Sequence, residues 1–140
     1  MSIQSKNDRE KFSQLRQSLS RLAGEIKRGV EPLFSNRPLI KGTVYELKRR
    51  CGKPGCKCAR GELHGCMVVS ASEGGKTRLQ VIPHESLFEI EEKVRRYQEL
   101  RRVRARLGEM YRKMLKVIDQ MEAMRREEWS SSGKRRSKGE

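Results

Sequence analysis

The sequence has few of the residues that build a large hydrophobic core. Only 34% of its 140 residues are hydrophobic and 5% are aromatic, whereas 36% are charged. A typical globular domain has about 25% charged residues. So little apolar material excludes a large compact core. We expect a small core that is supported by a metal ion, a partner chain or helices packed along their length.

Long apolar runs are missing as well. No stretch approaches the roughly 18–20 apolar residues that a membrane span needs, and the opening MSIQSKNDREKF lacks the apolar segment of a signal peptide. We therefore expect a cytoplasmic protein with no membrane association. In that compartment thiols stay reduced, which argues against a framework of disulfides.

The residue combinations of common enzymes are also absent. The sequence offers no Ser/His/Asp set, no glycine-rich phosphate loop and no pair of carboxylates that would share a pocket. We expect no enzymatic activity. The scarcity of aromatic residues further argues against stacking on single-stranded bases as the main mode of binding.

Positive charge is what the sequence has in excess. Its 33 lysines and arginines outnumber its 18 acidic residues, giving a net charge of +15. Such a surface predicts a polyanionic partner, and nucleic acid is the first candidate. Binding of this kind gains affinity from phosphate contacts and counterion release. Duplex DNA or structured RNA fits the composition better than a single strand.

The basic residues are concentrated in two stretches, 41–60 and 93–106, and each stretch contains a single glutamate. If the second stretch lies on a helix packed beside the first, the two would merge into one basic face. The alternative is a solvated helix face, but opposite charges usually alternate on such a face. The predicted phosphate contacts are Lys48, Arg49, Arg50, Lys53, Lys57, Arg60, Arg95, Arg96, Arg101, Arg102, Arg104 and Arg106.

Two stretches have helical periodicity. In residues 1–30 apolar residues recur in steps of three and four, and Asn7 or Asp8 suits the N-cap while Gly29 suits the end. In residues 84–128 a similar seam predicts one long coiled-coil helix, with one slip in its heptads. We expect an antiparallel pairing of the two helices within a chain, and dimerisation or recruitment of a partner protein through the remaining seam. Residues 129–140 form a polar, basic tail that we expect to be disordered.

The segment 31–83 between the helices indicates a small antiparallel sheet. Its predicted strands are Thr43–Leu47, Met67–Ser72 and Thr77–Ile82, and the paired glycines 74 and 75 suit a tight hairpin turn. We expect Leu79 and Val81 to point inward, opposite Val69 and Ala71. The expected fold class is thus α+β, with a three-stranded sheet flanked by an N-terminal helix and a long C-terminal helix.

All four cysteines fall within CGKPGCKCARGELHGC, residues 51–66, between the first strand and the hairpin. Tetrahedral Zn²⁺ takes four Cys or His ligands from short, closely spaced groups, often on tight turns. A redox pair would instead show Cys-x-x-Cys at a helix N-terminus. The spacing therefore predicts a structural zinc knuckle held by Cys51, Cys56 and Cys58. Either His64 or Cys66 supplies the fourth ligand, with thiolate affinity favouring Cys66.

The run RRCGKPGCKCARGELHG, followed by a hairpin and a helix, resembles a family of small uncharacterised bacterial and archaeal proteins with a CGKxxCxC…HG motif. The resemblance covers about residues 41–100 and implies that Cys51, Cys56, Cys58 and His64 are the shared ligands. It also implies a setting beside mobile elements. After the motif this chain has Cys66-Met67-Val68, where the family usually shows a proline and aromatics.

The sequence thus predicts a non-enzymatic, zinc-containing nucleic-acid-binding protein, with an accessory or regulatory role in a mobile element. The rival hypothesis is a structural adaptor whose coiled coil recruits a protein partner. In the rival, the positive charge serves solubility or recognition of an acidic partner. Charge reversal at Arg101 and Arg102 separates the two, because it abolishes only nucleic-acid binding in the first.

Overall fold

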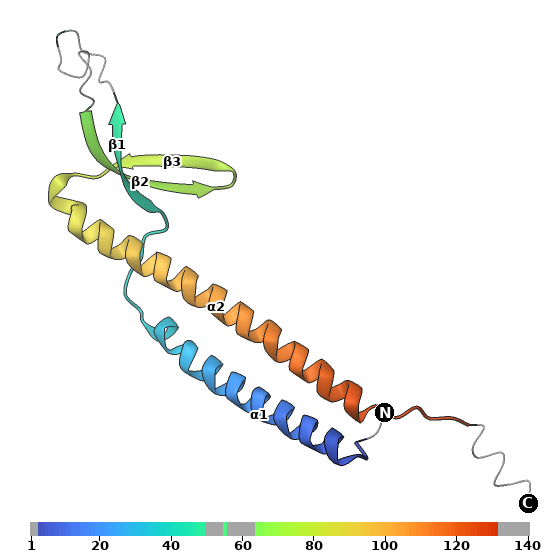
Figure 1. Cartoon of the computed structure of the whole chain (residues 1–140). Helices are drawn as coiled ribbons and strands as arrows, with labels where there is room; N and C mark the ends of the chain where they lie inside the picture. The colour runs from blue at the N-terminus through green and yellow to red at the C-terminus, as the bar shows by residue number, and fades with distance from the viewer. Residues whose placement is uncertain (1–2, 50–54, 56–63, 132–140) are drawn as a thin grey trace, which may run out of the picture. The chain divides into compact units, whose positions relative to one another are not determined.

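The computed structural model describes residues 3–49, 55 and 64–131. Their architecture confirms the α+β class, with an N-terminal helix, a three-stranded antiparallel sheet and a long C-terminal helix (Figure 1). The elements are helix α1 Lys6–Gly29, 3₁₀ helix η1 Glu31–Phe34, strands β1 Thr43–Arg49, β2 His64–Glu73 and β3 Lys76–Val81, 3₁₀ helix η3 His84–Ser86 and helix α2 Leu87–Arg125. None of the helices in the described part combines the length and the apolarity of a bilayer crossing.

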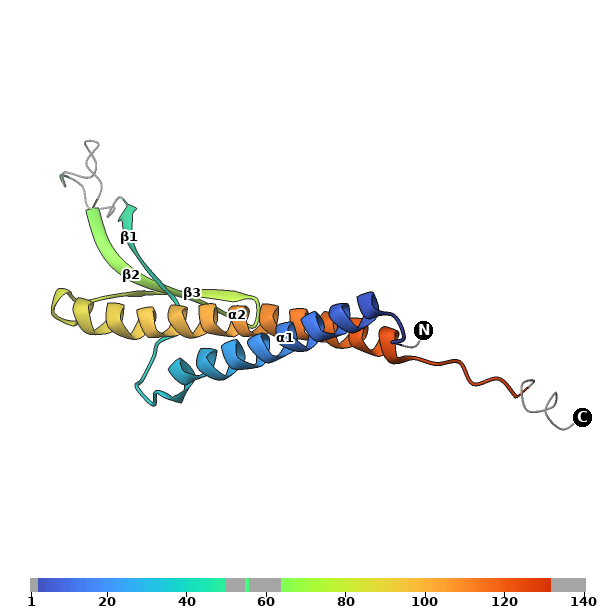
Figure 2. The same ribbon diagram turned by 60° about the horizontal axis from the view of Figure 1, so that its bottom comes forward.

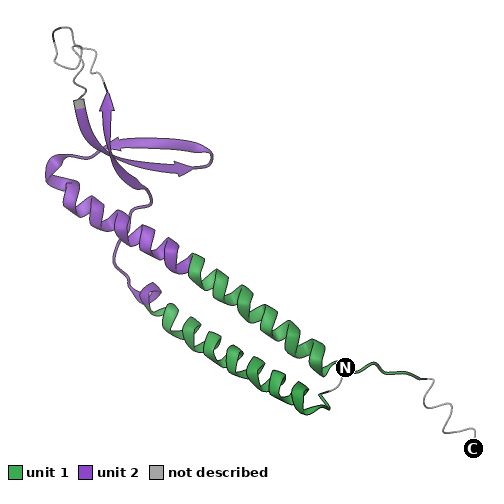
Figure 3. Cartoon of the chain, in the orientation of Figure 1, with its two compact units in different colours: residues 1–31, 105–140 green, residues 32–104 purple. Residues whose placement is uncertain are grey.

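The chain divides into two compact units, which share α2 between them (Figure 3). Unit 1 comprises Met1–Glu31 and Ala105–Glu140 and contains α1 with the later part of α2. Unit 2 comprises Pro32–Arg104 and contains the sheet with the earlier part of α2.

The hairpin of β2 and β3 has the predicted turn. Gly74 and Gly75 have φ angles of 57° and 79°, which a glycine adopts without steric cost. The two-residue turn sets the register, so Glu73 pairs with Lys76. The strands follow in the order β1-β2-β3, with both pairings antiparallel.

The inward orientation expected for Leu79 and Val81 is wrong. The turn pairs them with Ser70 and Val68, not with Val69 or Ala71, and their residues are 51% and 61% exposed. Neighbouring residues of a strand point to opposite faces, so a register shifted by one residue exchanges the two faces.

The core of unit 2 lies between one face of the sheet and α2. Val69, Ile82 and Val94 are buried there. The half-buried residues packed around them are Ile40, Val44, Met67, Leu87 and Ile90. The core is small, in keeping with the composition.

The segment before β1 is attached to α2 by two hydrogen bonds. The Ile40 amide donates to the Lys93 carbonyl at 3.1 Å, and Nη1 of Arg96 donates to the Pro38 carbonyl at 3.0 Å. Gly42 follows, with φ of 154°, and it is buried against β2. These contacts fix where β1 begins relative to α2.

Helix α1 begins earlier than the sequence predicts. Its N-cap is Ser5, whose hydroxyl accepts a hydrogen bond from the Asp8 amide at 3.0 Å. The Asp8 carboxylate in turn accepts from the Ser5 amide, which completes a capping box and lowers the pKa of Asp8. The prediction of Asn7 or Asp8 as the cap is therefore wrong, whereas the end of the helix at Gly29 is confirmed.

In unit 1, α1 and α2 run side by side in opposite directions (Figures 1 and 2). A methyl group at Gly29, near the end of α1, would lie 3.2 Å from Leu107 and 3.3 Å from Met110. Nearer the start of α1, Leu19 lies by Ile118 and Met121. Only Leu22 and Met110 are buried in this unit's described residues.

Candidate nucleic-acid interface

The ladder of β1 and β2 brings together the two ends of the cysteine-rich segment. Arg49, the last residue of β1, pairs with His64, the first residue of β2. The seven paired positions from Thr43 to Arg49 hold the two strands in register. Residues 50–63 therefore connect two chain ends whose separation is set by the sheet.

The predicted zinc ligands fall mostly outside the described residues. Cys51, Cys56 and Cys58 lie there, and so does the side chain of His64, whose backbone opens β2. Cys66 is described and has a free thiol. Among the described residues no three His, Cys, Asp or Glu side chains form a metal-binding group.

Cys66 lies on the sheet face that is turned away from α2. It pairs with Leu47 of β1, and alternation places it on the same face as Tyr45 and Val68. The residue is half-buried. Its position two residues into β2 keeps it next to the end of the cysteine-rich segment, as a fourth ligand would require.

The predicted phosphate contacts of the first stretch lie at the end of the same ladder or outside the described residues. Lys48 and Arg49 are exposed at the end of β1, on opposite faces of the sheet. Arg50, Lys53, Lys57 and Arg60 lie outside the described residues. Lys48 and Arg49 are thus the described residues among the predicted phosphate contacts of this stretch.

The first basic residues of α2 have partners within the chain. Lys93 forms an ion pair with Glu89 at 2.7 Å, and the hydrogen bond that it donates lowers the pKa of Glu89. Arg95 pairs with Glu92, and Arg96 donates to the Pro38 carbonyl as described above. These partners offset part of the positive charge that the sequence places at this end of the stretch.

The later arginines of α2 are the cations that remain available. Arg101, Arg102, Arg104 and Arg106 are exposed, and nothing in residues 3–49, 55 or 64–131 pairs with them. At about 100° per residue, Arg101 and Arg104 share one side of the helix while Arg102 and Arg106 share another. The first three belong to unit 2 and Arg106 to unit 1.

Within unit 2 the described residues among the predicted contacts lie on different elements, Lys48 and Arg49 on β1 and the arginines up to Arg104 on α2. The paired ends of β1 and β2 project away from α2 in both views (Figures 1 and 2). The packing of α2 involves the start of β1, near Val44, and the strand then runs away from the helix.

Sequence reasoning missed a mainly apolar groove beside α2. It has a volume of about 280 Å³, and Arg37 and Arg96 line it together with Glu99. Its apolar lining comes from Pro32, Leu33, Leu39, Leu100 and Val103. Leu33 and the neighbouring Phe34 are exposed, and two apolar residues in a segment between the helices were the only signal of this surface in the sequence.

A family model described as a domain of unknown function (DUF6788) matches residues 12–96, which is more than half of the chain. The match begins within α1, includes the whole sheet and ends within α2. Neither a curated protein nor a solved structure matches the chain.

Proposed function

The chain belongs to the DUF6788 family, whose description assigns no activity, and we propose from its own residues that it is a non-enzymatic, zinc-containing nucleic-acid-binding protein. The register of β1 and β2 carries the proposal. It brings the backbone of residues 49 and 64 together on either side of three cysteines, with Cys66 close by. The sheet holds both ends of the segment that contains the proposed metal ligands. This reduces the conformational entropy that the segment loses when it binds a metal ion.

The donor set suits zinc. Thiolates and imidazole are the ligands of structural zinc sites, and four of them close a tetrahedral shell with no open position. Cys51, Cys56 and Cys58 would hold the ion together with His64 or Cys66. Lys53, Lys57 and Arg60 lie between these ligands in the sequence and would partly offset the thiolate charge.

The proposed nucleic-acid contacts are cations that no acidic side chain in the described residues neutralises. Arg101, Arg102 and Arg104 on α2 would contact phosphates, because guanidinium groups bind them through two parallel hydrogen bonds. Lys48 and Arg49 would add a second set of contacts at the end of β1. The resemblance to proteins beside mobile elements extends the proposal to an accessory or regulatory role in such an element.

Two measurements on the purified full chain test the proposal. Metal analysis should find about one zinc per chain, and fluorescence anisotropy should detect binding to a DNA or RNA duplex that weakens steeply with salt. The charge reversals Arg101→Glu and Arg102→Glu should remove most of the binding. The matched control is Lys113→Glu, an exposed position elsewhere on α2. Affinity that stays flat between low and moderate salt would refute the basic surface.

The adaptor hypothesis is the second candidate, and the exposed apolar side chains of unit 1 favour it. Tyr111, Leu115 and Ile118 are exposed on α2, outside the predicted contacts with nucleic acid. If the charge reversals abolished recruitment of a protein partner while leaving duplex binding intact, the adaptor would be the better description.

A further inference from the structure

The later part of α2 is apolar over a wider sector than α1 can cover. The seam residues Leu107, Met110, Met114, Val117, Met121 and Met124 are buried or half-buried. Beside them lie Tyr111, Leu115 and Ile118, whose residues are 57%, 40% and 40% exposed. Spacings of four and three residues put these three in one row. Seam and row together span about 180° of the helix, whereas a single contact stripe needs about 100°.

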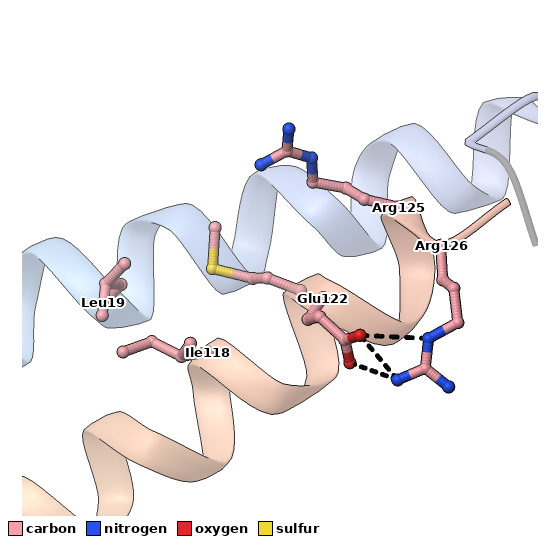
Figure 4. Close-up of a pocket in the computed structure, with 6 residues that line it drawn as sticks. Leu19, Ile118, Glu122, Arg125 and Arg126 are labelled. Atoms are coloured by element: carbon pink, nitrogen blue, oxygen red, sulfur yellow. Dashed lines mark hydrogen bonds and ion pairs between the residues drawn. The ribbon is translucent and has the colours of Figure 1, made fainter.

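A groove lies open where the row meets α1 (Figure 4). It has a volume of about 400 Å³, and Leu19, Ile118 and Met121 form its apolar lining. Leu19 of α1 and Ile118 of α2 point toward one another in it. At one end of the groove, Arg126 donates to both carboxylate oxygens of Glu122, at 2.6 and 2.7 Å. One helix pair is thus too narrow a layer to bury its own apolar side chains.

The charges beside the row identify a second copy of the chain as the partner. Arg112 and Asp119 are exposed, and each lies next to the row on the side away from the seam. Neither forms an ion pair within the described part of the chain. Two α2 helices that pack antiparallel about a two-fold axis near Leu115 bring each Arg112 beside Asp119 of the other copy. In this arrangement the apolar rows of the two copies face each other, and the charged residues beside one row face opposite charges of the other copy.

We propose that two copies of this chain associate through the row of Tyr111, Leu115 and Ile118. The two copies of α2 pack antiparallel across a two-fold axis, and the two copies of α1 complete a four-helix bundle. In such a bundle each helix contacts two neighbours, which accounts for the wide apolar sector of α2. This inference goes beyond nucleic-acid binding, and it holds or fails independently of zinc.

Sedimentation equilibrium of the full chain tests the association. The wild type should show twice the 16.3 kDa of one chain. The double variant Leu115→Glu with Ile118→Glu should show the mass of one chain and retain its helical circular dichroism. The control Gln120→Glu, exposed on the opposite side of α2, should remain dimeric. A monomeric wild type, or a double variant that still dimerises, would overturn the proposal.

A charge exchange tests the antiparallel register and avoids the risk that a core-facing variant unfolds. Arg112→Asp alone and Asp119→Arg alone should each raise the dimer dissociation constant several-fold, because each places like charges together in both symmetric copies. The double variant should restore the wild-type constant. Single variants without effect, or a double variant weaker than both, would rule out this two-fold arrangement.

Discussion

At Gly42 both the backbone and its surroundings require glycine. A φ of 154° is strained for any other residue, and an added Cβ would lie 2.8 Å from the Ser70 carbonyl oxygen and 2.9 Å from Val69. Gly42→Ala should therefore destabilise the chain by about 2 kcal/mol. The change in the free energy of unfolding is measured by urea denaturation followed by circular dichroism.

Gly24 is the matched control for this prediction. It lies within α1, where an added Cβ would meet only the flexible end of Arg28, at 3.4 Å. Gly24→Ala should stabilise the chain by about 0.5–1 kcal/mol, since alanine favours the helix. Equal effects of the two substitutions would contradict the close approach at the start of β1.

The cysteines make the second prediction at the scale of single residues. Replacing Cys51, Cys56 or Cys58 by serine should lower the zinc content to a small fraction of one ion per chain, because three ligands hold the ion far less tightly than four. Of His64→Ala and Cys66→Ser, only one should have the same effect, and that residue is the fourth ligand. Zinc is measured by mass spectrometry of the metal after dialysis. A full zinc content in all three cysteine variants would exclude the site.

Among the elements, the hairpin contains two valines of very different burial. Val69 of β2 is 8% exposed and faces α2, whereas Val81 of β3 is 61% exposed on the opposite face. Val69→Ala should cost about 2 kcal/mol of stability, and Val81→Ala less than about 0.5 kcal/mol. Both substitutions replace a valine by an alanine, so a difference between their denaturation midpoints in urea reflects the difference in burial of the two side chains. A larger loss at Val81 would favour the register expected from sequence.

The cap of α1 gives a prediction with a defined dependence on pH. The hydrogen bonds between Ser5 and Asp8 lower the pKa of Asp8 below the ordinary value of an aspartate side chain. A lowered pKa in the folded state means that stabilisation is present above about pH 4 and is lost as pH falls through the folded pKa. Ser5→Ala should cost about 1 kcal/mol at neutral pH, and the difference from wild type should shrink below pH 4. Thermal denaturation at both pH values measures it.

The elements themselves could be predicted from sequence because their signals are local. The three-and-four spacing from Phe12 to Ile26 predicted α1, and the paired glycines predicted the turn between β2 and β3. The face of β3 was predicted wrongly because Leu79 is apolar and was expected opposite Val69. The turn instead pairs Val69 with Gln80, which puts Leu79 on the other face of the sheet. The N-cap was missed because Ser5, Asn7 and Asp8 all suit it, and Asp8 proved to be its partner instead.

At the scale of the whole molecule, the sequence could locate the basic residues along the chain but not in space. It counted seven cations in residues 93–106 without showing that Lys93 and Arg95 pair with Glu89 and Glu92. It also could not show that the paired ends of β1 and β2 project away from α2. The two ion pairs are local, at spacings of four and three residues, whereas the course of β1 depends on contacts between residues far apart in sequence.

For the whole chain we propose that zinc holds residues 51–66 together and that arginines on α2 bind phosphate. Each should then make a separate contribution to nucleic-acid affinity. Loss of zinc should remove the contacts of the first basic stretch, including Lys53, Lys57 and Arg60, and leave those of α2 in place. The salt dependence should then decrease, since its slope follows the number of phosphates neutralised.

The most direct test is therefore a salt titration of duplex binding by the full chain, carried out before and after removal of zinc by a chelator. With zinc, affinity should fall steeply with salt on a double logarithmic plot. Without zinc, binding should be weaker and its slope shallower. Affinity and slope that are the same in both forms would contradict the claim that zinc organises the nucleic-acid surface.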